Sequence, residues 1–201
     1  MSTPAANELA EVKSLQSALK SGFLGSKVFR DETFVFVKRE KIADAIEHLK
    51  QHPDFGYDYF VECVGVDYLT WDHPRDLAER FEVVYNLYST KTHQRIYLKV
   101  GADEGQTIPS VKHIFLGAEY PEREIQDLYG VIFEGNEPIP GERFLLPDDW
   151  VGYPLRKDFP LGGEDVVFHE GTLGPAVEDV QMPHAGESFE GLTGSEDISG
   201  R

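Results

Sequence analysis

Three charged residues in one short segment have the types and spacing for acid–base chemistry. In the segment E-R-E-I-Q-D-L-Y-G, residues 122–130, Asp127 stands four positions after Arg123 and three after Glu124, so a helix would bring it close to both. Paired carboxylates at this spacing can serve as general acid and general base. The guanidinium of Arg123 would keep both carboxylates ionised, which argues against an acid with a raised pKa. We therefore favour a structural ion-pair network or a partner contact over a small hydrolase that uses Glu124 and Asp127.

A second charged segment, P-L-R-K-D-F-P-L, spans residues 154–161. Prolines on both sides stiffen its backbone and favour an extended chain that presents Arg156 and Lys157 outward. Arg156 could then form a bidentate salt bridge with another protein, although a solvated loop is the alternative. Nearby aromatic residues are of the types that anchor protein interfaces. The partner-binding residues that we predict are Arg123, Glu124, Asp127, Arg143, Trp150, Tyr153, Arg156, Lys157, Asp158 and Phe159.

Other catalytic and metal-binding chemistries find little support in the residues. The seven histidines are scattered, and Pro53 ends the one predicted helix on which two of them, His48 and His52, share a face. The single cysteine, Cys63, cannot supply the thiolates that zinc or iron–sulfur sites take, and its apolar surroundings predict a buried side chain. Phosphate-binding loops, dinucleotide fingerprints and nucleophile elbows are not found. We expect no catalytic site, no cofactor and no metal in this chain.

The charge of the chain limits what it can bind. With 36 acidic and 19 basic residues the formal net charge is −17, which opposes nucleic acids and anionic membrane surfaces by repulsion. No apolar run approaches the roughly 20 residues that cross a bilayer. Residues 1–7 show neither the basic region nor the apolar region of a secretory signal. We expect a chain on the cytoplasmic side that binds no nucleic acid.

Hydrophobic periodicity predicts helices in three regions. Apolar residues recur at helical spacing from about Glu8 to Lys20, with Asn7 as the predicted N-cap, and again from about Glu40 to Lys50. A helical pattern also begins at Pro109, with Val111, Ile114 and Phe115 apolar, breaks near residue 117 and resumes over residues 118–129. The last helix would carry the first charged motif.

Alternating apolar residues predict a sheet between and after these helices. The strands that we predict cover residues 27–30, 33–38, 59–69, 80–89 and 94–100. A short turn at residues 90–93 makes the last two strands a hairpin. The fold class is therefore α+β, a mostly antiparallel sheet packed with helices and followed by a long extended C-terminal arm.

The chain changes character after Gly130. Seven prolines and many glycines exclude long helices and central strands there, yet residues 133–168 carry a heavy load of aromatic and aliphatic side chains. This combination is typical of a segment that becomes ordered on a partner, although residues 133–161 could instead pack over their own domain. From Gly163 onward nine acidic residues face one basic residue. We predict a compact domain over residues 1–130, an extended partner-docking arm over 131–170 and an acidic, flexible tail over 171–201.

The two charged motifs together resemble the signature of one family. The match is strongest over residues 121–133 and 143–161 and weaker over 28–100, about two thirds of the chain in all. The motifs resemble those of the C subunit, or 30 kDa subunit family, of the proton-pumping NADH:quinone oxidoreductase, respiratory complex I. Homologous subunits of membrane-bound hydrogenases and related dehydrogenases share the pattern, and a stand-alone acidic binding protein is the alternative from another class.

The resemblance implies a structural role within a larger enzyme. It implies a small α+β domain whose C-terminal arm binds the D subunit principally, and also the B and I subunits. The chain itself would hold no cofactor, while iron–sulfur clusters, FMN and quinone would belong to the partner subunits. It would support electron transfer from NADH to quinone coupled to proton transport. Membrane association would come only through the complex, peripherally on the cytoplasmic side of the cell inner membrane.

Overall fold

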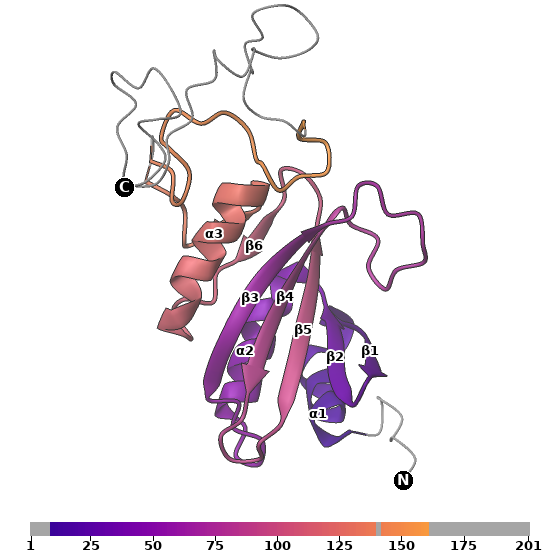
Figure 1. Ribbon diagram of the computed structural model, residues 1–201. Helices are drawn as coiled ribbons and strands as arrows, with labels where there is room; N and C mark the ends of the chain where they lie inside the picture. The colour runs from indigo at the N-terminus through magenta and orange to yellow at the C-terminus, as the bar shows by residue number, and fades with distance from the viewer. Residues whose placement is uncertain (1–8, 140–141, 161–201) are drawn as a thin grey trace, which may run out of the picture. The chain divides into compact units, whose positions relative to one another are not determined.

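Three helices lie against a five-stranded sheet in the residues that the structure, a computed structural model, describes, namely 9–139 and 142–160 (Figure 1). Short 3₁₀ turns, η2 (Lys20–Gly22), η3 (Arg39–Lys41) and η4 (Leu116–Ala118), adjoin the helices. The order of the other elements is α1 (Ala10–Leu19), β1 (Phe23–Phe29), β2 (Glu32–Val37), α2 (Ile42–Gln51), β3 (Tyr59–Asp67), β4 (Phe81–Tyr88), β5 (Arg95–Ala102), β6 (Thr107–Pro109), α3 (Glu119–Tyr129) and β7 (Ile132–Glu134).

The five-stranded sheet is mixed. Its strand order is β1-β2-β5-β4-β3, and every neighbouring pair is antiparallel except β2 with β5. The predicted hairpin of residues 80–89 and 94–100 is present as β4 and β5. Strands β6 and β7 form a separate parallel pair in which Ile108 lies opposite Phe133. The predicted fold class, α+β with a mostly antiparallel sheet, is confirmed.

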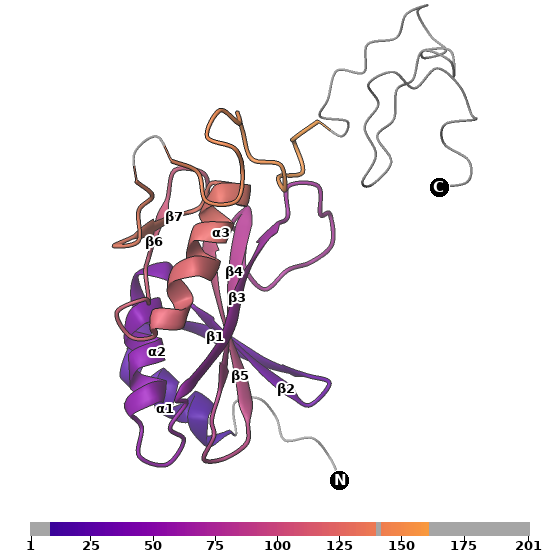
Figure 2. The same ribbon diagram turned by 60° about the vertical axis from the view of Figure 1, so that its left-hand side comes forward.

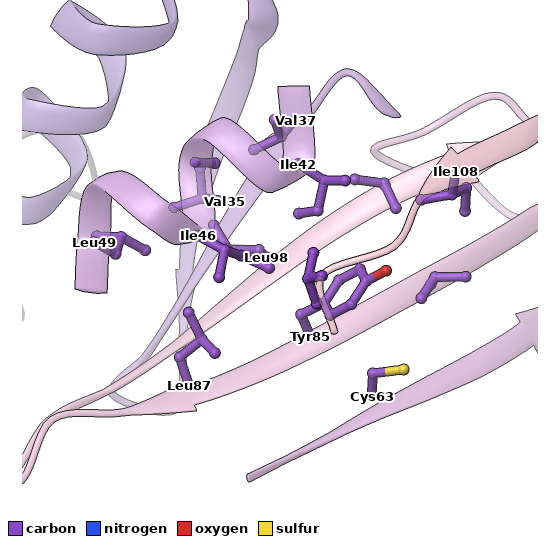
Figure 3. Packing of buried hydrophobic residues seen from close by; sticks show 14 of the residues in the cluster. Val35, Val37, Ile42, Ile46, Leu49, Cys63, Tyr85, Leu87, Leu98 and Ile108 are labelled. Carbon is purple, nitrogen blue, oxygen red and sulfur yellow. The ribbon is translucent and has the colours of Figure 1, made fainter. Parts of the chain in front are cut away.

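The core lies between one face of the sheet and the helices. Alternate residues of β4, among them Val83, Tyr85 and Leu87, are fully buried, as the period of two along a strand requires. Ile42 and Ile46 of α2 point onto this face (Figure 3). Figure 2 shows α1 and α2 together on one side of the sheet.

Helix α3 covers the same face of the sheet next to β3. Gly65 of β3 lies opposite Val83, so it faces the core. A Cβ atom at this glycine would stand 2.9 Å from Cγ2 of Ile125 and 3.1 Å from the ring of Tyr129. The absence of a side chain at residue 65 therefore lets α3 lie directly on the edge strand.

The helix predicted from Pro109 is wrong. Pro109 instead ends β6, and residues 111–115 make a single turn in which the N–H of Phe115 donates to the carbonyl of Val111. Val111 and Phe115 stand four positions apart, as on a helix, because this single turn directs both side chains into the core. Residues 107–109 form strand β6 because they pair with β7. This partner is distant in sequence, so local periodicity does not reveal it.

Parts of the sequence predictions fall outside the described residues. They are the N-cap Asn7, the last ten residues of the predicted arm and the acidic tail 171–201. In the part of the chain that the structure describes, no helix is long and apolar enough to cross a membrane.

Candidate docking site

Helix α3 places the first charged motif. Ile125 is buried against the sheet, and Pro121 is tolerated because the N–H groups of a first helical turn lack intrahelical acceptors. Gly130 ends the helix with φ of 76°, and its N–H donates to the carbonyl of Gln126 over 2.9 Å. Asp127 therefore lies in the last turn, where the following chain returns.

Residues 142–159, which we call the strap, return over the C-terminal end of α3 (Figures 1 and 2). The strap has no regular helix or strand, but the N–H of Leu155 donates to the carbonyl of Leu128 over 3.2 Å. The Nη2 of Arg143 also donates to the carbonyl of Gly152 over 2.7 Å. The described residues up to Phe159 belong to one compact unit. The strap thus packs on its own domain, one of the two arrangements that the sequence left open.

Asp127 holds the beginning of the strap. Its buried carboxylate accepts the backbone N–H groups of Leu145 and Leu146 over 2.8 and 2.9 Å. Its other oxygen pairs with Nε of Arg143 at 3.1 Å. The two hydrogen bonds from the amides are charge-assisted, and such bonds are about twice as strong as neutral ones. Two of the predicted site residues, Asp127 and Arg143, are therefore brought together.

The other two charged residues of the first motif point elsewhere. Arg123 pairs with Glu119, one turn earlier on α3, at 3.2 Å, and its Nε lies 3.4 Å from Oδ1 of Asn136. Glu124 is exposed to solvent. Glu124 and Asp127 therefore do not share an environment, as an acid–base pair would require.

Asp67, at the end of β3, holds the end of the strap. Its fully buried carboxylate accepts Nε and Nη2 of Arg80 over 3.0 and 2.8 Å, and the N–H groups of Leu69 and Lys157 over 3.0 and 2.9 Å. Burial alone would raise the pKa of Asp67, but these hydrogen bonds and the charge of Arg80 outweigh it and lower the pKa. The Nη2 of Arg80 also donates to Asp158 over 2.9 Å, which lowers the pKa of that exposed carboxyl.

Arg156 is bound within its own chain. Its Nε donates to the carbonyl of Tyr129 and its Nη1 to Glu104, both over 2.6 Å. The Cζ of its guanidinium also lies over two aromatic rings, 4.3 Å from the centroid of Tyr153 and 5.1 Å from that of Phe81. The guanidinium of Arg156, which the sequence assigned to a partner contact, therefore makes its hydrogen bonds within the chain.

The remaining predicted residues divide between inward and outward positions. Trp150 stacks on Phe159 with ring centroids 6.2 Å apart, and both rings are half-buried. The backbone of Lys157 is bound to Asp67, but its side chain is exposed. Of the cations in the second motif, Lys157 is the one that faces solvent.

The strap exposes large apolar side chains beside charged ones such as Lys157 and Asp158. Val151 is 87% exposed, Leu145 57% and Leu155 46%. The ring of Phe144 stacks on Tyr120 of α3, with centroids 5.8 Å apart. The strap is thus fixed by polar groups underneath and presents aliphatic side chains outward.

Glu122 has a role that the sequence reasoning missed. It is fully buried and accepts three hydrogen bonds, from the hydroxyl of Ser110 (2.5 Å), the N–H of Val111 (2.9 Å) and the amide of Asn136 (2.9 Å). Burial raises its pKa, and these donors oppose the rise only in part. The carboxylate thus connects α3 to the residues after β6 and to those after β7. No local sequence pattern predicts this arrangement.

The pair of Asp67 and Arg80 was also missed, although the sequence held a signal for it. The two residues flank the loop 68–79, and antiparallel pairing of the strands on either side brings the ends of such a loop together. An acidic residue at one end and a basic residue at the other therefore predict an ion pair. What the sequence could not show is that the strap would bind to that pair.

The site offers fixed charges rather than an obvious reaction centre. The hollow between α3 and the strap, lined among others by Gln126, Arg143 and Phe144, has a volume of about 120 Å³. Pockets for drug-sized ligands are larger, roughly 300 Å³ and upward. Over residues 9–139 and 142–160, no three His, Cys, Asp or Glu side chains gather in a group that could hold a metal ion.

Comparison with known proteins identifies relatives of this chain. The model of the family "Respiratory-chain NADH dehydrogenase, 30 Kd subunit" matches residues 35–165. The C subunit of the NADH-quinone oxidoreductase of Roseiflexus sp. (strain RS-1) is 43% identical over 155 residues, which are 77% of this chain and 84% of that protein. The protein of the same name from Geobacter metallireducens is 39% identical over 160 residues, 79% of this chain and 93% of its own length.

A solved structure shares the fold. It is described as Nqo5 of the trypsin-resistant fragment (1-134), with a TM-score of 0.55 and 30% identity, and the match covers 63% of this chain and 97% of that one. The fold is that of an α+β domain, and the relatives that share it are named as subunits of a larger enzyme. The chain belongs to the 30 kDa subunit family of respiratory-chain NADH dehydrogenase, which includes the C subunits of the NADH-quinone oxidoreductases of these bacteria. The resemblance drawn from the two charged motifs is confirmed.

Proposed function

We propose that this chain is a non-catalytic subunit that holds other subunits of the NADH-quinone oxidoreductase together. The observation that carries the proposal is the outward surface of the strap, where Leu145, Val151 and Leu155 are exposed on a backbone that buried carboxylates hold in place. Apolar groups that gather in one exposed patch are typical of a surface that a partner covers, and we infer that these three side chains form such a patch. The partners that we infer are the D subunit principally, with the B and I subunits adjacent.

The charges of the site support a structural role. Asp127 is buried beneath two amides and a guanidinium, and the carboxylate of Asp67 is occupied by four hydrogen bonds. A general acid needs a pKa near the working pH, whereas the pKa of Asp67 is lowered. Electron transfer from NADH to quinone and proton transport would then depend on FMN, iron–sulfur clusters and quinone in the partner subunits. The chain would be peripheral to the cell inner membrane, on its cytoplasmic side, through the complex alone.

The proposal is tested by replacing exposed apolar groups of the strap. In the double variant V151S/L155S, we expect the yield of the assembled complex to fall by roughly tenfold or more. Burial of a Val or Leu side chain contributes about 1.5 kcal/mol or more, and about 1.4 kcal/mol is a tenfold change in affinity. The measurement is co-purification of the partner subunits with the tagged full-length chain from native membranes.

A matched control separates docking from general loss of surface apolarity. L24S/V64S removes one leucine that is as exposed as Leu155, 49% against 46%, and one valine that is less exposed than Val151, 44% against 87%, from strands β1 and β3. Complex yield should stay near wild type in this control. If V151S/L155S assembles as well as L24S/V64S, the strap is not the docking surface.

A further inference from the structure

The domain binds the strap through the strap's own backbone. Asp127 accepts the N–H groups of Leu145 and Leu146, and Asp67 accepts the N–H of Lys157. Both carboxylates are buried, with side chains 4% and 0% exposed. Backbone donors do not depend on side-chain identity, so these bonds fix the path of the strap rather than the position of any one side chain.

The geometry at Asp67 requires a carboxylate. Oδ1 accepts the N–H of Leu69 and Nε of Arg80, while Oδ2 accepts Nη2 of Arg80 and the N–H of Lys157. Each oxygen therefore receives two donors. An asparagine would set an NH₂ group against two of these donors, leaving them buried and unpaired, whereas a carboxylate has acceptor sites for all four.

Order in the strap matters because ordering a segment during binding costs free energy. A flexible segment loses roughly 1–2 kcal/mol of backbone entropy for each residue that becomes fixed. A segment that is already fixed avoids that cost when a partner arrives. The proline-rich sequence lacks periodicity and suggested a segment that becomes ordered only on binding. The hydrogen bonds to Asp67 and Asp127 instead correspond to a segment that is already ordered.

We propose that Asp67 and Asp127 are positioning residues that order the strap on its own domain before any partner binds. They act toward its two ends: Asp127 binds Arg143, Leu145 and Leu146, and Asp67 binds the backbone of Lys157. Leu145, Val151 and Leu155 are thereby held exposed on an ordered backbone. The identity of the partner rests on the function proposed above, whereas the ordering itself is a property of the free chain.

Hydrogen exchange of the free, full-length chain tests the ordering directly. By NMR, the amides of Leu145, Leu146 and Lys157 should exchange at least about tenfold more slowly than the same residues in an unstructured peptide. D127N should speed exchange at Leu145 and Leu146 but not at Lys157, and D67N should do the reverse. E124Q, on the exposed face of the same helix as Asp127, is the control and should change neither. A merely structural role would instead change exchange throughout the domain.

Wild-type exchange alone can overturn the proposal. Should these three amides exchange at unstructured rates in the free chain, the strap becomes ordered only on the partner, and this holds even when a variant fails to fold. Slow wild-type exchange that D67N and D127N leave unchanged at their own ends would show that the carboxylates do not position the strap. Normal assembly of V151S/L155S together with slow exchange would remove the proposed docking function and leave this inference standing.

Discussion

At the scale of single residues, the protonation of His48 should affect the contact between helices α1 and α2. Its Nε2 lies 2.8 Å from the hydroxyl of Ser14, joining α2 to α1. Burial, together with the neighbouring His52, lowers its pKa below the usual 6.5. The folded chain therefore binds this proton less readily than the unfolded chain does.

This shift fixes the sign of a pH effect. The neutral form predominates in both states above pH 6.5, and stability should fall as the pH drops from 6.5 through the lower folded pKa. Thermal melting of wild type and His48→Gln between pH 7.5 and 5.5 checks this, and the variant should lose less of its melting temperature on acidification. His113→Gln, at an exposed position, is the control. Equal losses in His48→Gln and wild type would contradict the expectation.

At the scale of elements, the sequence predicted those whose cause is local. Ile42, Ile46 and Leu49 recur at helical spacing, and α2 follows this pattern within two residues at each boundary. Strands β4 and β5 alternate in the same way and are present. Strand β6 was missed because its partner β7 lies more than twenty residues away. The pairing with β7 determines the backbone of residues 107–109, whereas Val111 and Phe115 lie in the turn that follows.

The junction between α3 and the strap depends on Gly130. A Cβ atom there would stand 2.6 Å from both Nη2 of Arg156 and the ring of Tyr153, and the residue has a positive φ. In Gly130→Ala, the positive φ should introduce backbone strain of about 1 kcal/mol. The added Cβ should also displace the strap. We expect a lower free energy of unfolding and faster trypsin cleavage after Arg156 or Lys157.

Gly105 gives a matched control for this substitution. It has a φ of 78°, close to that of Gly130, but no atom lies within 4 Å of its missing Cβ. Gly105→Ala thus carries the strain without the clash, at roughly 1 kcal/mol. If both alanine variants lose the same stability and leave strap cleavage unchanged, contact with Gly130 does not hold the strap.

At the scale of the whole molecule, the sequence identified the family and the composition of the site but not its connections. Arg156 was recognisable as important from its place between two prolines, whereas its acceptors, Glu104 and the carbonyl of Tyr129, are distant in sequence. Asp67 gave no sign of binding the strap, because the bond uses a backbone N–H that every residue but proline has. Contacts through the backbone leave no trace in residue type, and for this reason the intrachain role of the second motif emerged only from the structure.

Core residues lie beyond the domain boundary that the sequence predicted at residue 130. Val131 and Phe133 are buried in the main apolar cluster, and Asn136 donates to the buried Glu122. A chain that ends after Gly130 loses all three residues, while one that ends after Glu137 keeps them. Loss of a buried Phe side chain alone lowers the free energy of unfolding by about 3–5 kcal/mol. The whole free energy of unfolding of a small domain is about 5–15 kcal/mol.

We therefore expect the two truncations to behave differently. The chain ending at residue 137 should unfold cooperatively on heating, whereas the chain ending at residue 130 should melt far lower or be unfolded already. Circular dichroism during heating measures both. Equal melting of the two chains would place the boundary at 130, and a 137-residue chain that is unfolded would mean that the strap completes the core rather than resting on it.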